Sequence, residues 1–126
     1  MDISRPLVDV PVFDWVLCLE VGEHVPAKYG ATVLDNIAFY ARRGVVLSWA
    51  RPGQLGHFHV NNRPNEWVIA QMGARGWAHD LETSRTVRRA ASFGHFKGTL
   101  MVFVLQKEDG RRNEEITMKR IGGRLK

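Results

Sequence analysis

Residues 14–26, DWVLCLEVGEHVP, decide how this sequence folds. They contain most of an apolar run, residues 13–21, in which only Asp14 and Glu20 are charged. Strands that are buried on both faces of a parallel sheet have this composition. The run therefore predicts a central, buried strand that ends just before a polar turn.

A helix is predicted directly after that turn. Pro26 suits the first turn of a helix, and apolar residues then recur at intervals of three and four, as on a buried helical face: Tyr29, Val33, Leu34, Ile37, Ala38 and Ala41. Residues 42–44, RRG, are expected to end this helix. Cations favour the negative end of the helix dipole, and glycine accepts the left-handed cap conformation.

The rest of the chain continues to alternate strands and helices. Residues 45–50, VVLSWA, predict a second buried strand, and a helix is expected from Pro64 to Gly76. A short strand at 77–80, a polar helix at 82–91 and a strong strand at 99–105 follow. This order predicts an α/β fold with a mostly parallel, layered sheet.

The length of 126 residues favours a single domain. We assign residues 1–107 to the α/β domain and residues 108–126 to a polar, basic tail. Six of the 18 lysine and arginine residues lie in residues 111–126, and basic termini are usually solvated. The tail has no interleaved aromatic residues, so nucleic-acid binding is not expected.

The chain carries no sign of export or membrane insertion. Its start, MDISRP, lacks the basic and then apolar pattern of a signal peptide. No apolar run reaches the roughly 20 residues of a membrane span. The single cysteine, Cys18, lies in an apolar run and cannot form a disulfide within the chain. We therefore expect a soluble, cytoplasmic protein.

Reactive side chains follow both predicted central strands. Glu20, Glu23 and His24 come after the first, and His57 and His59 lie on the loop after the second. Ligands of open parallel sheets bind outside the carboxyl ends of the strands, so we expect these five groups to line one cleft. His57 and His59 alternate, and in extended backbone they would share a face.

Each of these groups also has a purely structural interpretation. Glu20 and Glu23 could be solvated acids at a helix start, where they complement the dipole. His24 could fill the gap between turn and sheet, and the two loop histidines could simply be exposed. Trp49 and Trp67 are interpreted as core or pocket wall, because aromatic burial needs no function to explain it.

The aspartate, the apolar run and the Glu-His-Val-Pro turn of residues 14–26 resemble the fourth strand and following turn of class I S-adenosylmethionine-dependent methyltransferases. The later order is similar as well: a helix, a fifth strand at 45–50, another helix, and a late strand at 99–105 that runs antiparallel in that family. The resemblance covers residues 2–106. It implies a partial Rossmann-like fold, with S-adenosylmethionine as cofactor and methyl transfer as activity.

The resemblance also implies roles for individual residues. Asp2 corresponds to a position near the family's adenine-contacting acid, while Glu20 and Val21 correspond to positions along the methionine part of the cofactor. Glu23 is a further candidate for cofactor binding. The candidate catalytic residues are His24, His57 and His59, which could orient the substrate or move a proton. No metal site is implied, and the methyl acceptor is not indicated.

The family's glycine-rich cofactor loop has no counterpart here. The sequence contains no Gly-x-Gly-x-Gly turn after a strand, because the likeness begins where the family's third strand has ended. A truncated methyltransferase, lacking the first βαβ half, is therefore expected. Alone it should be inactive and bind S-adenosylmethionine weakly or not at all.

Two other functions stay open. The chain could be a non-catalytic remnant or partner subunit, or a metal-dependent hydrolase that uses the His57/His59 loop with Glu20 and Glu23. In the family's sheet, the strand at 14–21 lies between the first and fifth strands, and only the second of these neighbours is present. We therefore expect self-association or a protein partner that adds a strand.

Overall fold

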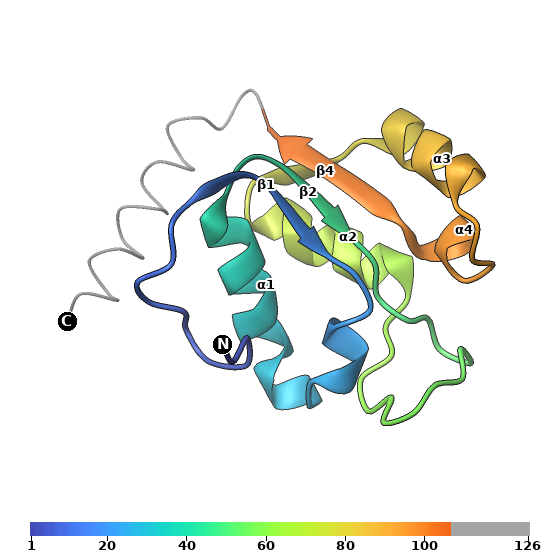
Figure 1. Cartoon of the computed structure of the whole chain (residues 1–126), viewed down its shortest axis with the longest axis horizontal. Coiled ribbons are helices and arrows are strands. Elements are labelled where there is room, and N and C mark those ends of the chain that lie inside the picture. Colours follow the sequence, from blue (N-terminus) through green and yellow to red (C-terminus); the bar gives the residue numbers. More distant parts are fainter. Residues whose placement is uncertain (107–126) are drawn as a thin grey trace.

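The computed structural model describes residues 1–106, which form a four-stranded sheet with helices on both sides (Figure 1). The strands are β1 (Phe13–Cys18), β2 (Ala41–Leu47), β3 (Trp77–His79) and β4 (Met101–Leu105). Their order across the sheet is β1-β2-β4-β3. β1 pairs with β2 in parallel, whereas β4 is antiparallel to both of its neighbours. The predicted α/β sheet with a late antiparallel strand is therefore confirmed; the predicted tail, residues 108–126, lies outside the described residues.

Helices cover both faces of this sheet unequally. The bounds are η1 (Gly22–His24), η2 (Ala27–Tyr29), α1 (Gly30–Tyr40), α2 (Asn65–Ala74), α3 (Leu81–Ala90) and α4 (Phe96–Thr99). α1 and α2 lie on one side of the sheet and α3 on the other (Figure 1). The core lies between the sheet and helices α1 and α2. It includes Cys18, Val33, Leu34, Ile37, Val45, Leu47, Val68, Met72, Trp77, Met101 and Phe103. None of these described helices is long and apolar enough to cross a membrane.

Within residues 1–106, β1 is an edge strand with one exposed face. Among the described residues it pairs only with β2. Phe13, Trp15 and Leu17 are 49%, 50% and 67% exposed, whereas Cys18 packs into the core. The prediction of a central strand buried on both faces is therefore wrong for this face. The physical reason is that no helix within residues 1–106 covers β1 on the side opposite α1.

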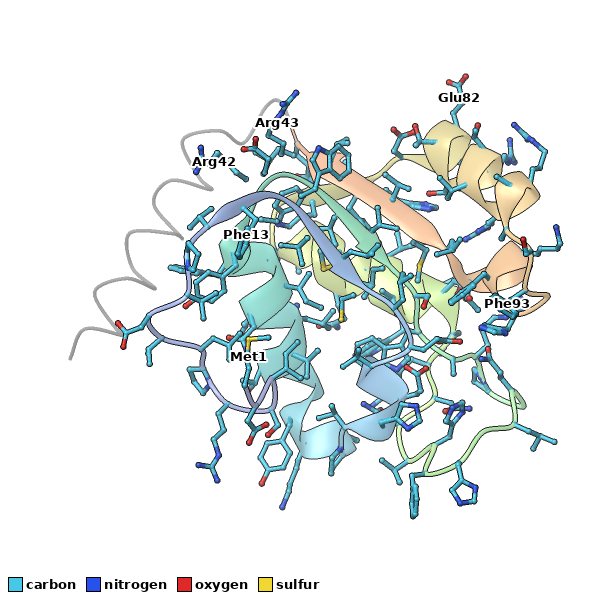
Figure 2. The ribbon with its side chains drawn as sticks, in the orientation of Figure 1. Met1, Phe13, Arg42, Arg43, Glu82 and Phe93 are labelled. Atoms are coloured by element: carbon cyan, nitrogen blue, oxygen red, sulfur yellow. The ribbon has the colours of Figure 1, made fainter. Side chains whose placement is uncertain are left out.

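The boundary between α1 and β2 also differs from the prediction. α1 ends at Tyr40, and Ala41 is already extended, with φ −92° and ψ 140°. Arg42 and Arg43 belong to β2 and extend outward from the sheet (Figure 2). Gly44 is not a left-handed cap; it pairs with Trp15, and an added Cβ would stand 2.1 Å from the indole. The close approach of this ring, rather than a helix end, requires glycine.

The amino-terminal segment is fastened to α1. The Asn36 side-chain amide donates to the carbonyls of Ile3 and Arg5 at 3.0 and 2.8 Å, and its oxygen accepts from Leu7 N at 3.0 Å. Tyr40 donates to the carbonyl of Leu7 at 2.5 Å. These bonds hold the first residues of the chain beside the helix (Figure 1).

Candidate functional site

The chain segments that leave β1 and β2 are bonded to each other. Ser48 N donates to the carbonyl of Cys18 at 3.1 Å, and Glu20 N donates to Ser48 Oγ at 2.9 Å. Glu20 has a φ of 53°, in the left-handed region that costs a non-glycine residue about 1–2 kcal/mol. Such strained residues concentrate at functional sites. This turn fixes Glu20 at the carboxyl end of the sheet.

The Glu20 carboxylate contacts residues from three other segments. Oε1 accepts from Gln54 Nε2 at 3.0 Å and lies 3.4 Å from His95 Nε2, while Oε2 accepts from Ser48 Oγ at 3.4 Å. His95, Gln54 and Ser48 were not among the candidates from the sequence. Sequence spacing could not pair His95 with Glu20, because the two are far apart in the chain. His95 directly precedes the short helix α4, and they meet only in the folded protein.

Glu23 is completely buried within η1. Neither carboxyl oxygen has a hydrogen-bond partner of good geometry among the described residues. Burial, followed by the nearby Glu20 carboxyl, raises the pKa of Glu23 to about 7, although the backbone N–H groups of Glu23 and Ala50 oppose the rise. A buried carboxyl without partners is costly, and such a group in a native fold calls for an explanation.

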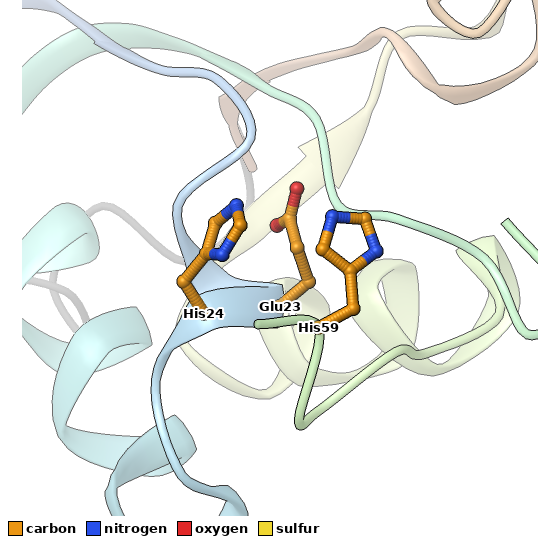
Figure 3. A group of neighbouring side chains, drawn as sticks. All are labelled: Glu23, His24 and His59. Atoms are coloured by element: carbon orange, nitrogen blue, oxygen red, sulfur yellow. The ribbon is translucent and has the colours of Figure 1, made fainter. Parts of the chain in front are cut away.

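Two of the predicted histidines lie beside this carboxyl. His24 and His59 meet edge to face, with ring centroids 4.9 Å apart. Glu23, His24 and His59 each offer one potential ligand atom, and these atoms lie within 4.8 Å of one another (Figure 3). The loop that carries His59 is bonded to η1, since Val60 N and Asn61 N both donate to the carbonyl of Glu23, at 2.8 and 3.0 Å.

His57 does not join this group. Phe58 has a φ of 57°, which interrupts the extended backbone that the alternation assumed. His57 is exposed, and its ring contacts Phe58 with centroids 4.9 Å apart. The expectation that His57 and His59 share a face is therefore wrong, because a left-handed residue between them turns the chain.

The other candidates have different surroundings. Asp2 is exposed, and its Oδ1 accepts from Ser4 N at 3.0 Å and Ser4 Oγ at 2.6 Å. The side-chain bond from Ser4 is the main reason that the pKa of Asp2 lies below its ordinary value. Within residues 1–106, Asp2 makes no hydrogen bond or ion pair with Glu20 or Glu23. Val21 is partly buried and packs against the core.

Trp49 belongs to the buried core next to η1. It is fully buried, its Nε1 donates to the carbonyl of Asn61 at 2.7 Å, and its ring meets Trp67 edge to face at 5.4 Å. Gly22 of η1 lies against this ring. The interpretation of Trp49 as core or pocket wall is confirmed.

Comparison with solved structures identifies the fold. No protein-family model matches the sequence, and no curated protein matches it either. Magnesium protoporphyrin IX methyltransferase (ChlM) from Synechocystis PCC 6803 with bound SAH matches with a TM-score of 0.58 at 16% identity, over 84% of this chain and 49% of that chain. LepI in complex with SAM matches with a TM-score of 0.52 at 13% identity, over 84% of this chain and 29% of the LepI chain.

The chain thus has part of the class I S-adenosylmethionine-dependent methyltransferase fold, as its resemblance implied. It spans about half or less of the length of these matched proteins. A structure described as a pericyclic reaction enzyme matches as well, with a TM-score of 0.53 at 12% identity. One fold can host different reactions, so function has to be argued from the site.

Proposed function

We propose that this chain forms the carboxyl-terminal half of a methyltransferase domain and contributes one side of its S-adenosylmethionine site. The observation that carries the proposal is the position of Glu20, at the carboxyl end of β1 and bonded to the segment after β2. In the methyltransferase fold, this is where a bound ligand meets the sheet. By the resemblance, Glu20 and Val21 border the methionine part of the cofactor.

The residues at this edge fit a cationic ligand. S-adenosylmethionine carries positive charge on its sulfonium and amino groups, and Glu20 and Glu23 offer two neighbouring carboxyl groups. Within the described residues, no lysine or arginine forms an ion pair with either of them. His95, 3.4 Å from Glu20 Oε1, is the one described side chain that forms an ion pair with either carboxyl group. The methionine end of the cofactor is proposed to lie beside Glu20, with the adenine end toward Asp2.

When bound, the cofactor would supply an activated methyl group. The proposed work of this chain is to position it and the acceptor, since an in-line transfer depends mainly on proximity and alignment. His24 and His59 would orient the acceptor beside Glu23. His57, exposed on the same loop, would contact a larger acceptor from outside.

The glycine-rich half of the cofactor site is proposed to come from sequence other than residues 1–126, in the same or a separate polypeptide. No Gly-x-Gly turn exists in this sequence to hold the adenosine part of the cofactor. Within residues 1–106, β1 has no strand partner on the side away from β2, and by the resemblance the family's first strand would lie there. A partner strand at that edge would complete both the sheet and the site.

Calorimetric titration of S-adenosylmethionine into the isolated chain tests this proposal. We expect weak or undetectable binding, because Glu20 and Val21 cannot replace the glycine-rich loop. A micromolar dissociation constant for the monomeric chain would contradict the assignment of this half. Sequencing the gene upstream of Met1 adds a second test, since an in-frame Gly-x-Gly-x-Gly segment would supply the other half directly.

The two rival functions separate on further measurements. A non-catalytic partner subunit would add strands to another chain but take no part in cofactor binding. In that case, Glu20→Gln in this chain should leave the complex's affinity for S-adenosylmethionine unchanged. The hydrolase alternative used His57 as a metal ligand, and His57 lies apart from the group formed by Glu23, His24 and His59.

A further inference from the structure

We infer that Glu23, His24 and His59 form a binding site for a divalent transition-metal ion of the zinc or manganese type. One potential ligand atom from each residue lies within 4.8 Å of the other two. Figure 3 shows the two imidazole rings on either side of the Glu23 carboxyl group, each with one ring nitrogen on the carboxyl side. Two imidazole nitrogens and a carboxylate oxygen form a donor set that such ions prefer.

The hydrogen bonds of the two histidines leave the correct nitrogen for a metal. His24 Nδ1 lies 3.3 Å from the carbonyl oxygen of Phe58, and His59 Nδ1 lies 3.2 Å from that of Gln54. A carbonyl can only accept, so in the neutral ring each Nδ1 carries the hydrogen and each Nε2 has the lone pair. Metal-binding histidines are oriented in this way, with the second nitrogen bonded to a carbonyl or carboxylate.

The buried carboxyl of Glu23 supplies an independent observation. Its side chain is fully buried, and neither oxygen has a hydrogen-bond partner of good geometry in the described part of the chain. No lysine or arginine within residues 1–106 forms an ion pair with it. A cation held between this carboxylate and two imidazoles would satisfy a group that the fold otherwise leaves without a partner.

The backbone holds the ligands together. Glu23 and His24 are consecutive in η1, and the loop behind His59 is bonded to the same turn through Val60 N and Asn61 N. Ligand atoms on a zinc ion stand roughly 3.3 Å apart, given bonds of about 2.0–2.1 Å. Binding therefore requires the side chains to close slightly, and the exposed ring of His24 has room to do so.

Three protein ligands leave at least one coordination position open, as in catalytic rather than structural zinc sites. In a consequence that rests on the proposed function, this position would take an oxygen atom of the methyl acceptor. The acceptor class would then be an alcohol, phenol or carboxylate that the metal ion can polarise.

The inference is tested by titrating Zn²⁺, and separately Mn²⁺, into the full chain without cofactor or acceptor. We expect one equivalent to bind. His24→Ala, His59→Ala and Glu23→Gln should each weaken binding by roughly tenfold or more, as loss of a metal contact typically does. His57→Ala is the matched control, because His57 is exposed and lies outside the group, and it should bind like the unaltered chain. Visible absorption of bound Co²⁺ should report nitrogen and oxygen ligands, with no thiolate band.

Several results would overturn the site. These are no stoichiometric binding of either ion, an unchanged affinity in Glu23→Gln, or a loss in His57→Ala as large as in His59→Ala. His24→Ala decides the matter if the buried Glu23 variant does not fold, because the His24 side chain is exposed. Circular dichroism checks each variant. A monomeric chain that binds zinc and also binds S-adenosylmethionine with a micromolar dissociation constant would keep this inference and contradict the proposed function.

Discussion

The indole of Trp49 lies so close to Gly22 that a Cβ atom added to Gly22 would stand 2.5 Å from three of its ring atoms. The ring has little freedom to move, since it is fully buried and bonded through Nε1 to the carbonyl of Asn61. This contact seats η1 on the segment that follows β2. The positions of Glu23 and His24 therefore depend on a glycine that precedes them.

We predict that Gly22→Ala lowers the free energy of unfolding by about 1–3 kcal/mol, the usual cost of overpacking a core. Gly73→Ala is the control, because it lies in α2 with nothing within 4 Å of its added Cβ. That change should raise stability by about 0.5–1 kcal/mol through helix propensity. Urea denaturation measures both, and shifts of the same sign would contradict the packing argument.

A second prediction concerns Ser84, which is fully buried in α3. Its Oγ donates to the carbonyl of Asp80 at 2.6 Å and accepts from Val102 N of β4 at 2.8 Å. Ser84→Ala would leave that buried N–H unsatisfied, at a cost of about 1–3 kcal/mol. Ser92→Ala, at an exposed position, should leave the unfolding midpoint unchanged. An equal effect of both variants in chemical denaturation would show that Ser84 does not tie α3 to the sheet.

The thiol of Cys18 gives a third prediction. Burial, and then the charge of Glu23, raises the pKa of Cys18 to about 11. Because the thiolate is the reactive form, the folded protein should resist a disulfide reagent in mildly alkaline buffer. Guanidinium should expose the thiol and allow rapid reaction of the chain's single cysteine. Fast modification of the folded protein would mean that the end of β1 opens readily.

Much of the fold could be predicted because its elements carry clear periodicity. The apolar positions of α1, such as Val33, Leu34 and Ile37, recur at helical spacing and do form the core. The error at residues 42–44 arose because an Arg-Arg-Gly sequence has the composition of a helix end. In the folded protein, Gly44 instead lies in β2 beneath the ring of Trp15. That contact joins residues far apart in the chain, so local sequence could not predict it.

The site was predictable to a smaller extent. The rule for open sheets correctly brought Glu23, His24 and His59 to one edge. It could not reveal that Phe58 turns the backbone and separates His57 from His59. Nor could local sequence show that Glu23 would be buried without a partner, since Asn61 and the neighbouring loop enclose η1 only in the folded chain.

The final prediction concerns the exposed face of β1. Phe13, Trp15 and Leu17 are 49–67% exposed, on a strand that pairs with one neighbour among the described residues. Exposed apolar patches and open strand edges both promote association. We therefore expect the isolated chain to self-associate, or to require a partner that adds a strand beside β1.

Leu17→Lys should reduce this association, because a charge on an edge strand disfavours further pairing. Leu55→Lys is the matched control: Leu55 is 96% exposed, but it lies in the loop before His57 rather than on β1. Sedimentation velocity over a range of concentrations compares the three proteins. A fully monomeric unaltered chain would contradict the prediction, and equal loss of association in both variants would show that general apolar exposure, rather than the edge of β1, holds the copies together.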